Sequence, residues 1–236
     1  MDTLTGGLNH TTETKFSQIS TIVFPDGHWG KIGFNQTFNK YRKSFEYIDP
    51  ENRFLQIENI RRYSSKFYDT LYSIINCLQN SDGIIFVYTR FIYGGVIPFA
   101  LALEELGFKK YGGNSLLRNN VENRLSYKGK YDEGESQASY IAITADKFLS
   151  PDWVNELREI NKDNQDGRKI RVVIGSEKMS EGVSLLNVRQ VHILNPWWHV
   201  NLIEQVIGRS IRYRSHCDIE EKDRNDTWLI QDSQSW

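Results

Sequence analysis

Short apolar, β-branched runs that alternate with helical patterns are the feature that most limits how this chain can fold. One run follows a turn at Ser81-Asp82-Gly83, and a helical stretch that ends at Gly107 comes after it. Buried strands that alternate with helices are typical of a parallel sheet, because each parallel connection needs a crossover segment. The sequence therefore predicts an α/β fold. Its later strands are expected at Tyr140–Thr144, Arg171–Gly175, Gln190–Leu194 and Thr227–Ile230, and its later helices at Pro151–Ile160 and about 200–212.

A helix is also predicted before the first strand. From Ser64 onward, apolar residues recur at the spacing of one helix face, and either Ser64 or Ser65 can serve as the N-cap. The apolar run from Gly83 to Leu103 is long enough to raise the question of a membrane span, but Arg90, two glycines and a proline interrupt it. A buried strand, a loop and a helix explain this run better.

Two parts of the chain differ in composition. Residues 1–60 are polar and aromatic, with turn signals such as PDGHWG and IDPEN and little helical periodicity, which predicts an arm or linker with short extended pieces. Residues 61–236 carry the strand and helix patterns and form the predicted α/β domain. Within it, residues 118–139 are polar and rich in Gly, Ser and Asn, as expected of a long surface loop.

The charges of the chain nearly cancel, which limits its partners. The 29 Lys and Arg residues against 30 Asp and Glu residues give a formal net charge of -1, which excludes the globally basic surface of histone-like proteins. Any contact with nucleic acid is therefore expected to be local. Two cysteines and a polar first segment without an apolar core predict an intracellular protein that is not secreted and has no disulfide framework.

The stretch from Arg171 to His216 carries most of the information about function. Each of its two strands is followed by a polar loop, first GSEKMSEGVS and then NPWWH. In parallel sheets, ligand sites lie at the carboxyl ends of the strands. Both loops are therefore expected at one edge of the sheet.

The helix predicted at about 200–212 presents a polar face with two arginines. At about 100° per residue, Gln205, Arg209 and Arg212 share one arc, and apolar residues occupy the opposite side. Gly208, at the edge of that arc, costs about 1 kcal/mol relative to alanine and indicates close approach of a ligand or backbone. Arginine suits bidentate recognition of phosphate. Taken alone, the helix fits a solvated or salt-bridged surface better, but the Ser-Glu-Gly-Val-Ser loop before it favours the phosphate interpretation.

At these residues the chain resembles the C-terminal RecA-like lobe of superfamily 2 helicases and translocases. GSEKMSEGVSL is similar to motif V of that superfamily, QVIGRSIR to motif VI and GIIFVYTR to the strand of motif IV, whereas NPWWH resembles a segment of Swi/Snf-type translocases. More narrowly, TIVFPDGHWGKIGF, RRYSSKF, LALEELGFKKYGG and the stretch from Glu181 to His216 resemble helicases of large cytoplasmic DNA viruses. Those helicases are relatives of the poxvirus early transcription factor small subunit and of nucleoside triphosphate phosphohydrolase I. The resemblance covers most of residues 64–230.

The resemblance implies roles for named residues. Arg212 would be the arginine finger that reaches ATP bound on another lobe, and Arg209 would also contact the phosphates. The residues implied at the nucleotide are Gln205, Gly208, Glu181, Gly182 and Ser184, and those implied at the nucleic-acid backbone are Ser176, Lys178, Tyr88, Thr89 and Arg90.

The chain also departs from the superfamily pattern, because its sequence has no G-x-x-x-x-G-K-[ST] phosphate loop and no strand that ends in a DExH-like box. Phosphoryl transfer needs the lysine of that loop, Mg2+ and a residue that positions water. The chain therefore carries at most half of the active site of a nucleic-acid-dependent ATPase. ATP would be shared with an N-terminal RecA-like lobe, in cis or in trans, which would hold Mg2+, and this chain alone is expected to be inactive.

Two functions remain open. The first is the second motor lobe of an ATP-dependent nucleic-acid helicase or translocase in viral transcription, which would grip the backbone of DNA or RNA and meet a viral RNA polymerase. It would act in the host cytoplasm or the virion, without a membrane. The second is a stand-alone, non-catalytic nucleic-acid-binding or scaffolding module of the same fold. In the first case residues 1–60 would be an arm or inter-lobe linker and residues 61–236 the helicase C-terminal RecA-like domain.

Several conspicuous residues have simpler structural explanations. A tryptophan pair before a helix is more often a packing anchor than a platform for base stacking. A histidine inside an apolar strand belongs more often to the core than to a catalytic site, and His216-Cys217 lacks a second pair of ligands at metal spacing. The tryptophan pair is Trp197 and Trp198, and the histidine in the strand is His192. Four basic residues of the polar loop are expected to be solvated, namely Arg118, Arg124, Lys128 and Lys130.

Overall fold

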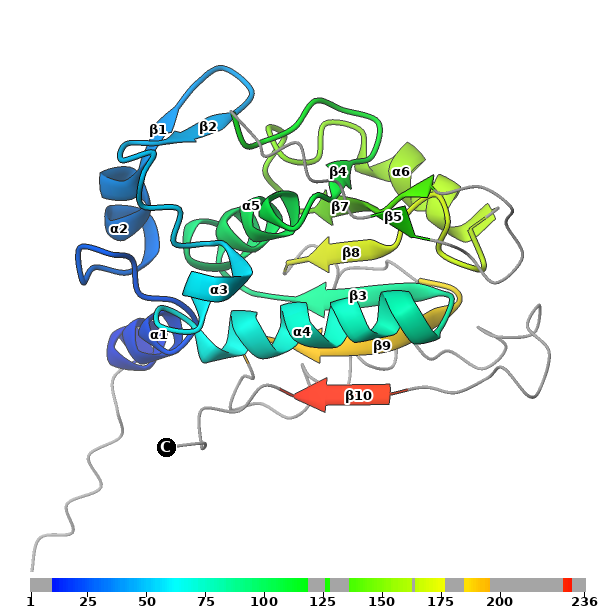
Figure 1. Cartoon of the computed structure of the whole chain (residues 1–236), viewed down its shortest axis with the longest axis horizontal. Helices are drawn as coiled ribbons and strands as arrows, with labels where there is room; N and C mark the ends of the chain where they lie inside the picture. The colour runs from blue at the N-terminus through cyan, green and yellow to red at the C-terminus, as the bar shows by residue number, and fades with distance from the viewer. Residues whose placement is uncertain are drawn as a thin grey trace, which may run out of the picture.

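A parallel sheet forms the centre of the molecule (Figure 1). The computed structural model describes residues 10–118, 126–127, 136–162, 164–176, 185–195 and 227–230. Every pair of neighbouring strands in the six-stranded sheet is parallel, which confirms the predicted α/β class and gives a RecA-like arrangement. In spatial order the strands are β10 (Thr227–Ile230), β9 (Val188–Ile193), β3 (Ile84–Tyr88), β8 (Val172–Gly175), β7 (Ser139–Ile143) and β4 (Lys109–Lys110).

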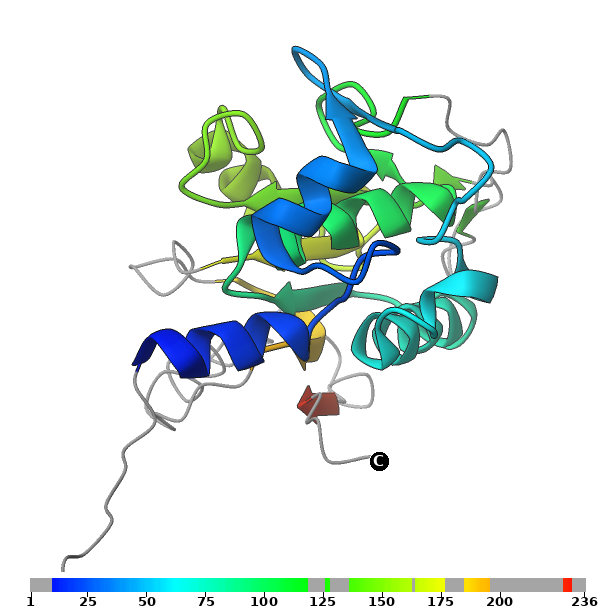
Figure 2. The same ribbon diagram turned by 90° about the vertical axis from the view of Figure 1, so that its left-hand side faces the viewer.

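Helices cover both faces of this sheet, as Figure 2 shows. Successive side chains of a strand point to opposite faces, so Val87 of β3 joins one hydrophobic cluster and its neighbour Phe86 joins the other. Both clusters consist of residues that are almost completely buried. The first cluster includes residues of α4 (Ser65–Asn80) and α5 (Ile97–Glu105), and the second includes Ile160 of α6 (Trp153–Lys162).

The helix predicted before the first strand is confirmed as α4. Ser64 is its N-cap, and the hydroxyl oxygen of Ser64 accepts a hydrogen bond from the backbone N–H of Phe67 at 3.0 Å. This bond satisfies one of the amides that the first turn of a helix leaves free. The strands predicted after it are confirmed to within two residues at each end. The helix expected at about 200–212 lies outside the described residues. The predicted surface loop at residues 118–139 contains the antiparallel pair β5 (Ser126–Tyr127) and β6 (Ser136–Gln137).

A buried arginine fastens the other end of α4. Arg171, just before β8, donates hydrogen bonds to the carbonyl oxygens of Cys77, Ser81 and Gly83. Only 1% of Arg171 is exposed, and this burial lowers the pKa of its guanidinium. Arg171 thereby supplies donors to one carbonyl group in the last turn of α4 and to two carbonyl groups after it. Arg171 thus holds the end of α4 against the beginnings of β3 and β8.

The long apolar run contains the predicted strand and helix, and the predicted loop between them is a short connection followed by a π-helical segment. After β3 the chain forms a π-helical segment, η1 (Ile92–Val96), which leads directly into α5. Gly107 follows α5 with a φ of +93°, a left-handed conformation that suits glycine at the end of a helix. None of the helices in the described part of the chain is long and apolar enough to span a membrane.

Residues 10–60 pack against the α/β domain and are more helical than their sequence pattern predicts. The helices are short, and a short helix shows too little periodicity to be distinguished from a loop in the sequence. The segment consists of α1 (His10–Ile19), α2 (Gly30–Thr37), the hairpin of β1 (Phe38–Lys40) and β2 (Phe45–Tyr47), and α3 (Ile57–Ile60).

Aromatic side chains fasten this arm to the domain. The ring of Phe34 stacks on Phe38 with centroids 4.9 Å apart and meets Phe45 edge-on at 5.1 Å. It also meets Tyr93 of η1 at 5.4 Å. Such pairs are worth about 0.5–1.5 kcal/mol each beyond the burial of their area. Arm and domain therefore share one hydrophobic core.

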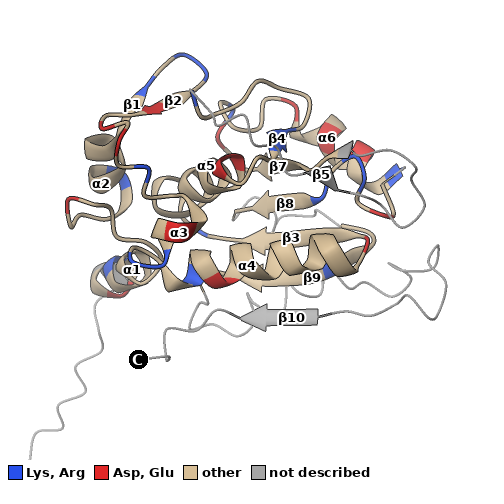
Figure 3. Ribbon diagram, viewed as in Figure 1, with Lys and Arg blue, Asp and Glu red and all other residues tan. Residues whose placement is uncertain are grey.

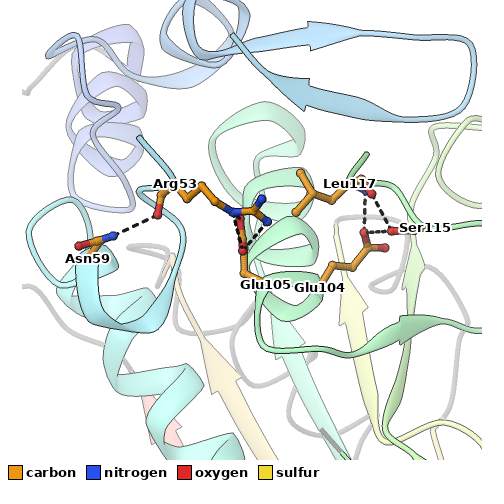
Figure 4. A network of polar contacts seen from close by, with 6 residues as sticks. All are labelled: Arg53, Asn59, Glu104, Glu105, Ser115 and Leu117. Carbon is orange, nitrogen blue, oxygen red and sulfur yellow. Dashed lines mark hydrogen bonds and ion pairs between the residues drawn. The ribbon is translucent and has the colours of Figure 1, made fainter. Parts of the chain in front are cut away.

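Two consecutive glutamates at the end of α5 join different segments (Figure 4). Glu105 accepts from Arg53 of the arm, with Nε at 3.1 Å and Nη2 at 2.9 Å from the carboxylate. Glu104 is fully buried and accepts from the backbone amides of Leu116 at 2.8 Å and Leu117 at 2.6 Å. Burial raises the pKa of Glu104, and these hydrogen bonds lower it. The segment that follows β4 is thereby fixed against α5.

Candidate functional site at the carboxyl edge of the sheet

The carboxyl ends of three neighbouring strands meet at one edge of the sheet. Strand β3 pairs in parallel with β8 on one side and with β9 on the other, where the register shifts between Ile84 and Ile85. Directly beyond the strands, the N–H of Thr89 donates to the last carbonyl of β8 at 3.0 Å, and the N–H of Leu194 donates to the carbonyl of Tyr88 at 3.0 Å. The two polar loops begin here, at Ser176 and Asn195, as the strand pattern predicts. We call this region the carboxyl edge.

Asn195 joins β3, β9 and the arm. Its Oδ1 accepts from the hydroxyl of Thr89 at 2.6 Å and from the backbone N–H of Arg90 at 3.3 Å. Its Nδ2 donates to the hydroxyl of Thr21 and to the carbonyl of Ser17, the latter at 3.5 Å. Asn195, Thr89 and Thr21 are all at least 96% buried, so these bonds replace those that water would otherwise make.

The first turn of α4 strengthens the same edge. The amine of Lys66, which is 5% exposed, donates to the carbonyl of Leu194 at 3.1 Å. The hydroxyl of Ser64 donates to the carbonyl of Thr21 at 2.5 Å. Neither Lys66 nor Asn195 is predicted by the sequence pattern, because bonds between residues so far apart leave no local signal. The available signal was a single polar residue, Asn195, directly after an apolar strand.

The three residues predicted to contact nucleic acid at the end of β3 lie in different surroundings. Tyr88 is buried in the cluster between the sheet and α6, and the hydroxyl of Thr89 is buried against Asn195. Arg90 is half-buried, and its guanidinium lies 5.9 Å from the centre of the Phe91 ring. Of the three, Arg90 is therefore the least buried. Contact of these residues with nucleic acid stays a prediction.

The π-helical segment η1 approaches Thr89 closely. A Cβ atom on Gly95 would overlap the hydroxyl of Thr89, so the approach requires glycine. On the arm side of η1, the exposed amine of Lys31 lies 5.4 Å from the centre of the Tyr93 ring. Segments of π-helix occur frequently at functional sites. Here η1 lies between the carboxyl edge and helix α2 of the arm.

All of the predicted nucleotide-binding residues lie outside the described residues. Ser176, predicted to contact the nucleic-acid backbone, is described, is 4% exposed, and donates its backbone N–H to the carbonyl of Ile143 at 3.2 Å. The roles assigned to the other candidates stay predictions. The candidates outside the described residues are Lys178, Glu181, Gly182, Ser184, Gln205, Gly208, Arg209 and Arg212, and the same holds for Trp197 and Trp198.

The described part of the carboxyl edge lacks the donor set of a magnesium site. Directly after β8, β3 and β9 lie Ser176, Thr89, Arg90, Leu194 and Asn195, none of which is acidic. No group of three or more His, Cys, Asp or Glu residues in the described ranges could hold a metal ion. Magnesium prefers carboxylate oxygens, whereas guanidinium, amide and hydroxyl groups suit phosphate oxygens.

His192 is confirmed as a core residue. It lies inside β9 and is completely buried, and its Nε2 lies 3.3 Å from the side-chain oxygen of Gln190. Burial lowers the pKa of His192 to about 4. The imidazole is therefore neutral at neutral pH.

Comparison with known proteins confirms the resemblance. Residues 138–214 match the family described as the helicase conserved C-terminal domain. The chain is 35% identical over 205 residues to a "Putative ATP-dependent RNA helicase" of Acanthamoeba polyphaga mimivirus. The aligned region covers 86% of this chain and 29% of that protein. A protein of the same description from Heliothis virescens ascovirus 3e is 27% identical, over 85% of this chain and 20% of that protein.

Two further matches are shorter or more distant. "Nucleoside triphosphatase I" of Choristoneura biennis entomopoxvirus is 40% identical over 79 residues, which cover 33% of this chain and 12% of that protein. The solved C-terminal part of the Fun30 ATPase domain covers 70% of this chain and 41% of that chain, with 14% identity and a TM-score of 0.44. The chain spans less than a third of the length of these curated relatives.

Proposed function

Because the chain carries the conserved C-terminal domain of helicases, we propose that it is the second motor lobe of an ATP-dependent nucleic-acid helicase or translocase that acts in viral transcription. The match over residues 138–214 carries this proposal, since that range holds the SEGVS loop and most of the QVIGRSIRYRSH segment. Similarity to viral proteins named as ATP-dependent RNA helicases and to a nucleoside triphosphatase supports ATP as the nucleotide.

In this proposal the lobe completes an ATP site whose other half, with Mg2+, belongs to an N-terminal RecA-like lobe. Arg212 and Arg209 approach the phosphates when the two lobes close. A guanidinium placed there stabilises the negative charge that develops on the transferred phosphoryl group. Gln205 and Gly208 lie beside these arginines in the sequence, and the loop with Glu181, Gly182 and Ser184 couples nucleotide to nucleic acid.

The carboxyl edge supplies a rigid base for this coupling. The bonds of Asn195 to Thr89 and Thr21 hold the beginning of one loop, and the pairing of β8 with β3 holds Ser176 at the beginning of the other. In the proposed mechanism Ser176, Lys178 and Arg90 contact the phosphate backbone of DNA or RNA. Backbone contacts make binding tolerant of sequence and sensitive to salt. A viral RNA polymerase is the proposed larger partner, in the host cytoplasm or the virion.

The proposal is tested by nucleic-acid-stimulated ATPase activity of this chain alone and of the chain joined to an N-terminal RecA-like lobe. We expect no activity from the chain alone and stimulated activity from the joined protein. Arg212→Ala should lower kcat by about 1000-fold, the scale measured for arginine fingers. Arg158→Ala, at an exposed position of α6, is the control and should leave kcat unchanged.

Two results would contradict the motor function. One is a joined, folded protein that never hydrolyses ATP; the other is full activity in Arg212→Ala. A joined protein that binds nucleic acid without hydrolysing ATP would instead support the non-catalytic module.

A further inference from the structure

The turn between β1 and β2 is a concentrated basic surface. Lys40, Tyr41, Arg42 and Lys43 follow one another there, and all four side chains are exposed. Figure 3 shows the blue of Lys and Arg on this projecting loop. Within the described part of the chain, Lys40, Arg42 and Lys43 form no ion pair with an acidic residue. We call residues 40–43 the basic hairpin.

Tertiary packing adds cations from two other segments. The guanidinium of Arg118 lies 4.0 Å from the centre of the Tyr41 ring. It is held there because the backbone of Arg118 donates to the carbonyl of Phe45 at 2.8 Å. The amine of Lys40 lies 5.0 Å from the centre of the Phe148 ring, which brings the exposed Lys147 to the same surface.

The three segments that meet here are basic although the whole chain is not. Residues 40–43, 110–118 and 147–148 contain six Lys or Arg residues and no Asp or Glu, in a chain whose net charge is -1. Burial and the nearby charge of Lys43 lower the pKa of Lys110, and Glu156 raises it. The carboxylates beside this surface are Glu46, which hydrogen-bonds Tyr41, and Glu156 and Glu104, which act on Lys110.

The composition of this surface favours nucleic acid over an acidic protein. Tyr41 is 40% exposed, and its hydrogen bond with Glu46 raises the pKa of its hydroxyl. A partly exposed ring fixed beside guanidinium and ammonium groups suits a strand that offers both bases and phosphates. An acidic protein surface would use the cations but not the ring.

We propose that the basic hairpin, together with Arg118, binds the phosphate backbone of a single-stranded nucleic acid, outside the carboxyl edge and its loops. The surface lies beside the edge strand β4, where Lys110 is located, and thus extends the path of a strand beyond β8, β3 and β9. The inference rests on the proposed nucleic-acid-dependent function. It adds a contact that the helicase motifs do not include.

The test is binding of the full chain to a fluorescein-labelled single strand of about 20 nucleotides, measured by anisotropy over a range of KCl concentrations. The triple variant K40A/R42A/K43A should bind about 10-fold more weakly at low salt, and its slope of log Kd against log salt should fall by about 2. The control triple R62A/R158A/K162A removes the same charge from exposed positions elsewhere and should change Kd less than about twofold.

Further variants separate the parts of the surface. Tyr41→Ala should weaken binding of a single strand by several-fold and binding of a duplex little, because only unpaired bases are free to stack on the ring. Arg118→Ala should lower the salt slope although it lies far from the hairpin in the sequence. The unfolding temperature of each variant should stay that of the wild type, because these positions are exposed.

The outcomes distinguish this inference from the proposed function. If the wild-type chain binds the strand and the hairpin triple binds equally well, the basic hairpin is not a nucleic-acid site and the motor function stands. If both triples weaken binding equally, the effect is one of total charge and the inference is wrong. If no wild-type binding is measured and the joined two-lobe protein shows no stimulated ATPase activity, the proposed function fails as well.

Discussion

The hydroxyl of Thr89 donates to the side-chain oxygen of Asn195 at 2.6 Å, across 106 residues of sequence. Both side chains are at least 96% buried, and the amide nitrogen of Asn195 donates to Thr21 of the arm. One side chain therefore fixes the end of β3, the beginning of the loop after β9 and the end of α1 relative to one another. A ligand bound by that loop would therefore be positioned relative to the sheet.

Asn195→Ala should lower the free energy of unfolding by about 2–3 kcal/mol, because the buried hydroxyls of Thr89 and Thr21 lose a partner. Urea unfolding followed by circular dichroism measures this difference. Asn80→Ala removes a side-chain bond at an exposed position and should change stability by less than about 0.5 kcal/mol. Equal changes in the free energy of unfolding for the two substitutions would show that the buried amide of Asn195 does not stabilise the fold more than an exposed side-chain bond does.

Gly95→Ala should destabilise the protein by about 1–3 kcal/mol, because the new methyl group would overlap the hydroxyl of Thr89 and force η1 away from the carboxyl edge. Gly113→Ala is the matched control, since a Cβ there would come no closer than 3.7 Å to its nearest neighbour. Thermal unfolding of both variants measures the difference. A Gly95→Ala protein as stable as the Gly113→Ala protein would contradict the close approach of η1.

Arg171→Met should cost about 2–3 kcal/mol, because a buried guanidinium that donates to the carbonyl groups of Cys77, Ser81 and Gly83 is removed and the buried carbonyl of Gly83 loses this donor. Methionine keeps much of the side-chain volume, so the change tests the hydrogen bonds more than the packing. Arg168→Met removes a partly exposed guanidinium that pairs with Asp166 and should cost less than about 1 kcal/mol. Denaturant midpoints that shift equally in the two variants would speak against the anchoring role.

His192 should make stability depend on pH in a definite direction. Its pKa in the folded protein is about 4, below the ordinary value of 6.5. Between these values the unfolded chain binds a proton that the folded chain does not, so stability falls as the pH is lowered. The loss amounts to about 3 kcal/mol in total and is complete near pH 4.

The free energy of unfolding measured between pH 7.5 and 4.5 tests this, with His192→Asn as the variant that cannot titrate. The difference between wild type and His192→Asn should shrink or change sign as the pH falls. A pH profile of His192→Asn parallel to that of the wild type would show that His192 is not the group responsible.

Much of the α/β domain could be predicted from local patterns. The N-cap at Ser64 and the limits of β10 at Thr227–Ile230 agree with the expectation, because capping and strand preferences act within a few residues. The short helix α2 could not be predicted, since it packs through distant aromatic contacts such as those of Phe34 with Phe38 and Tyr93. Nor could α1, whose Ser17 accepts a hydrogen bond from the distant Asn195. The spatial order of the strands is likewise absent from the local patterns.

The candidate site divides in the same way. The expectation that two polar loops begin at one edge is confirmed by the positions of Ser176 and Asn195. Arg118, expected in a solvated loop, lies against the ring of Tyr41 in a basic surface that no single segment contains.

By itself the sequence determined the alternation of strands and helices, the near-neutral charge that makes any nucleic-acid contact local, and the loop and helix segments that resemble helicase motifs. Only the tertiary structure decided which polar groups are buried at the carboxyl edge and which cations share a surface. The physical reason is range. Periodicity, capping and turn preferences act over a few residues, whereas burial, hydrogen bonds such as Thr89 to Asn195 and electrostatic clustering depend on which distant segments the folded sheet brings together.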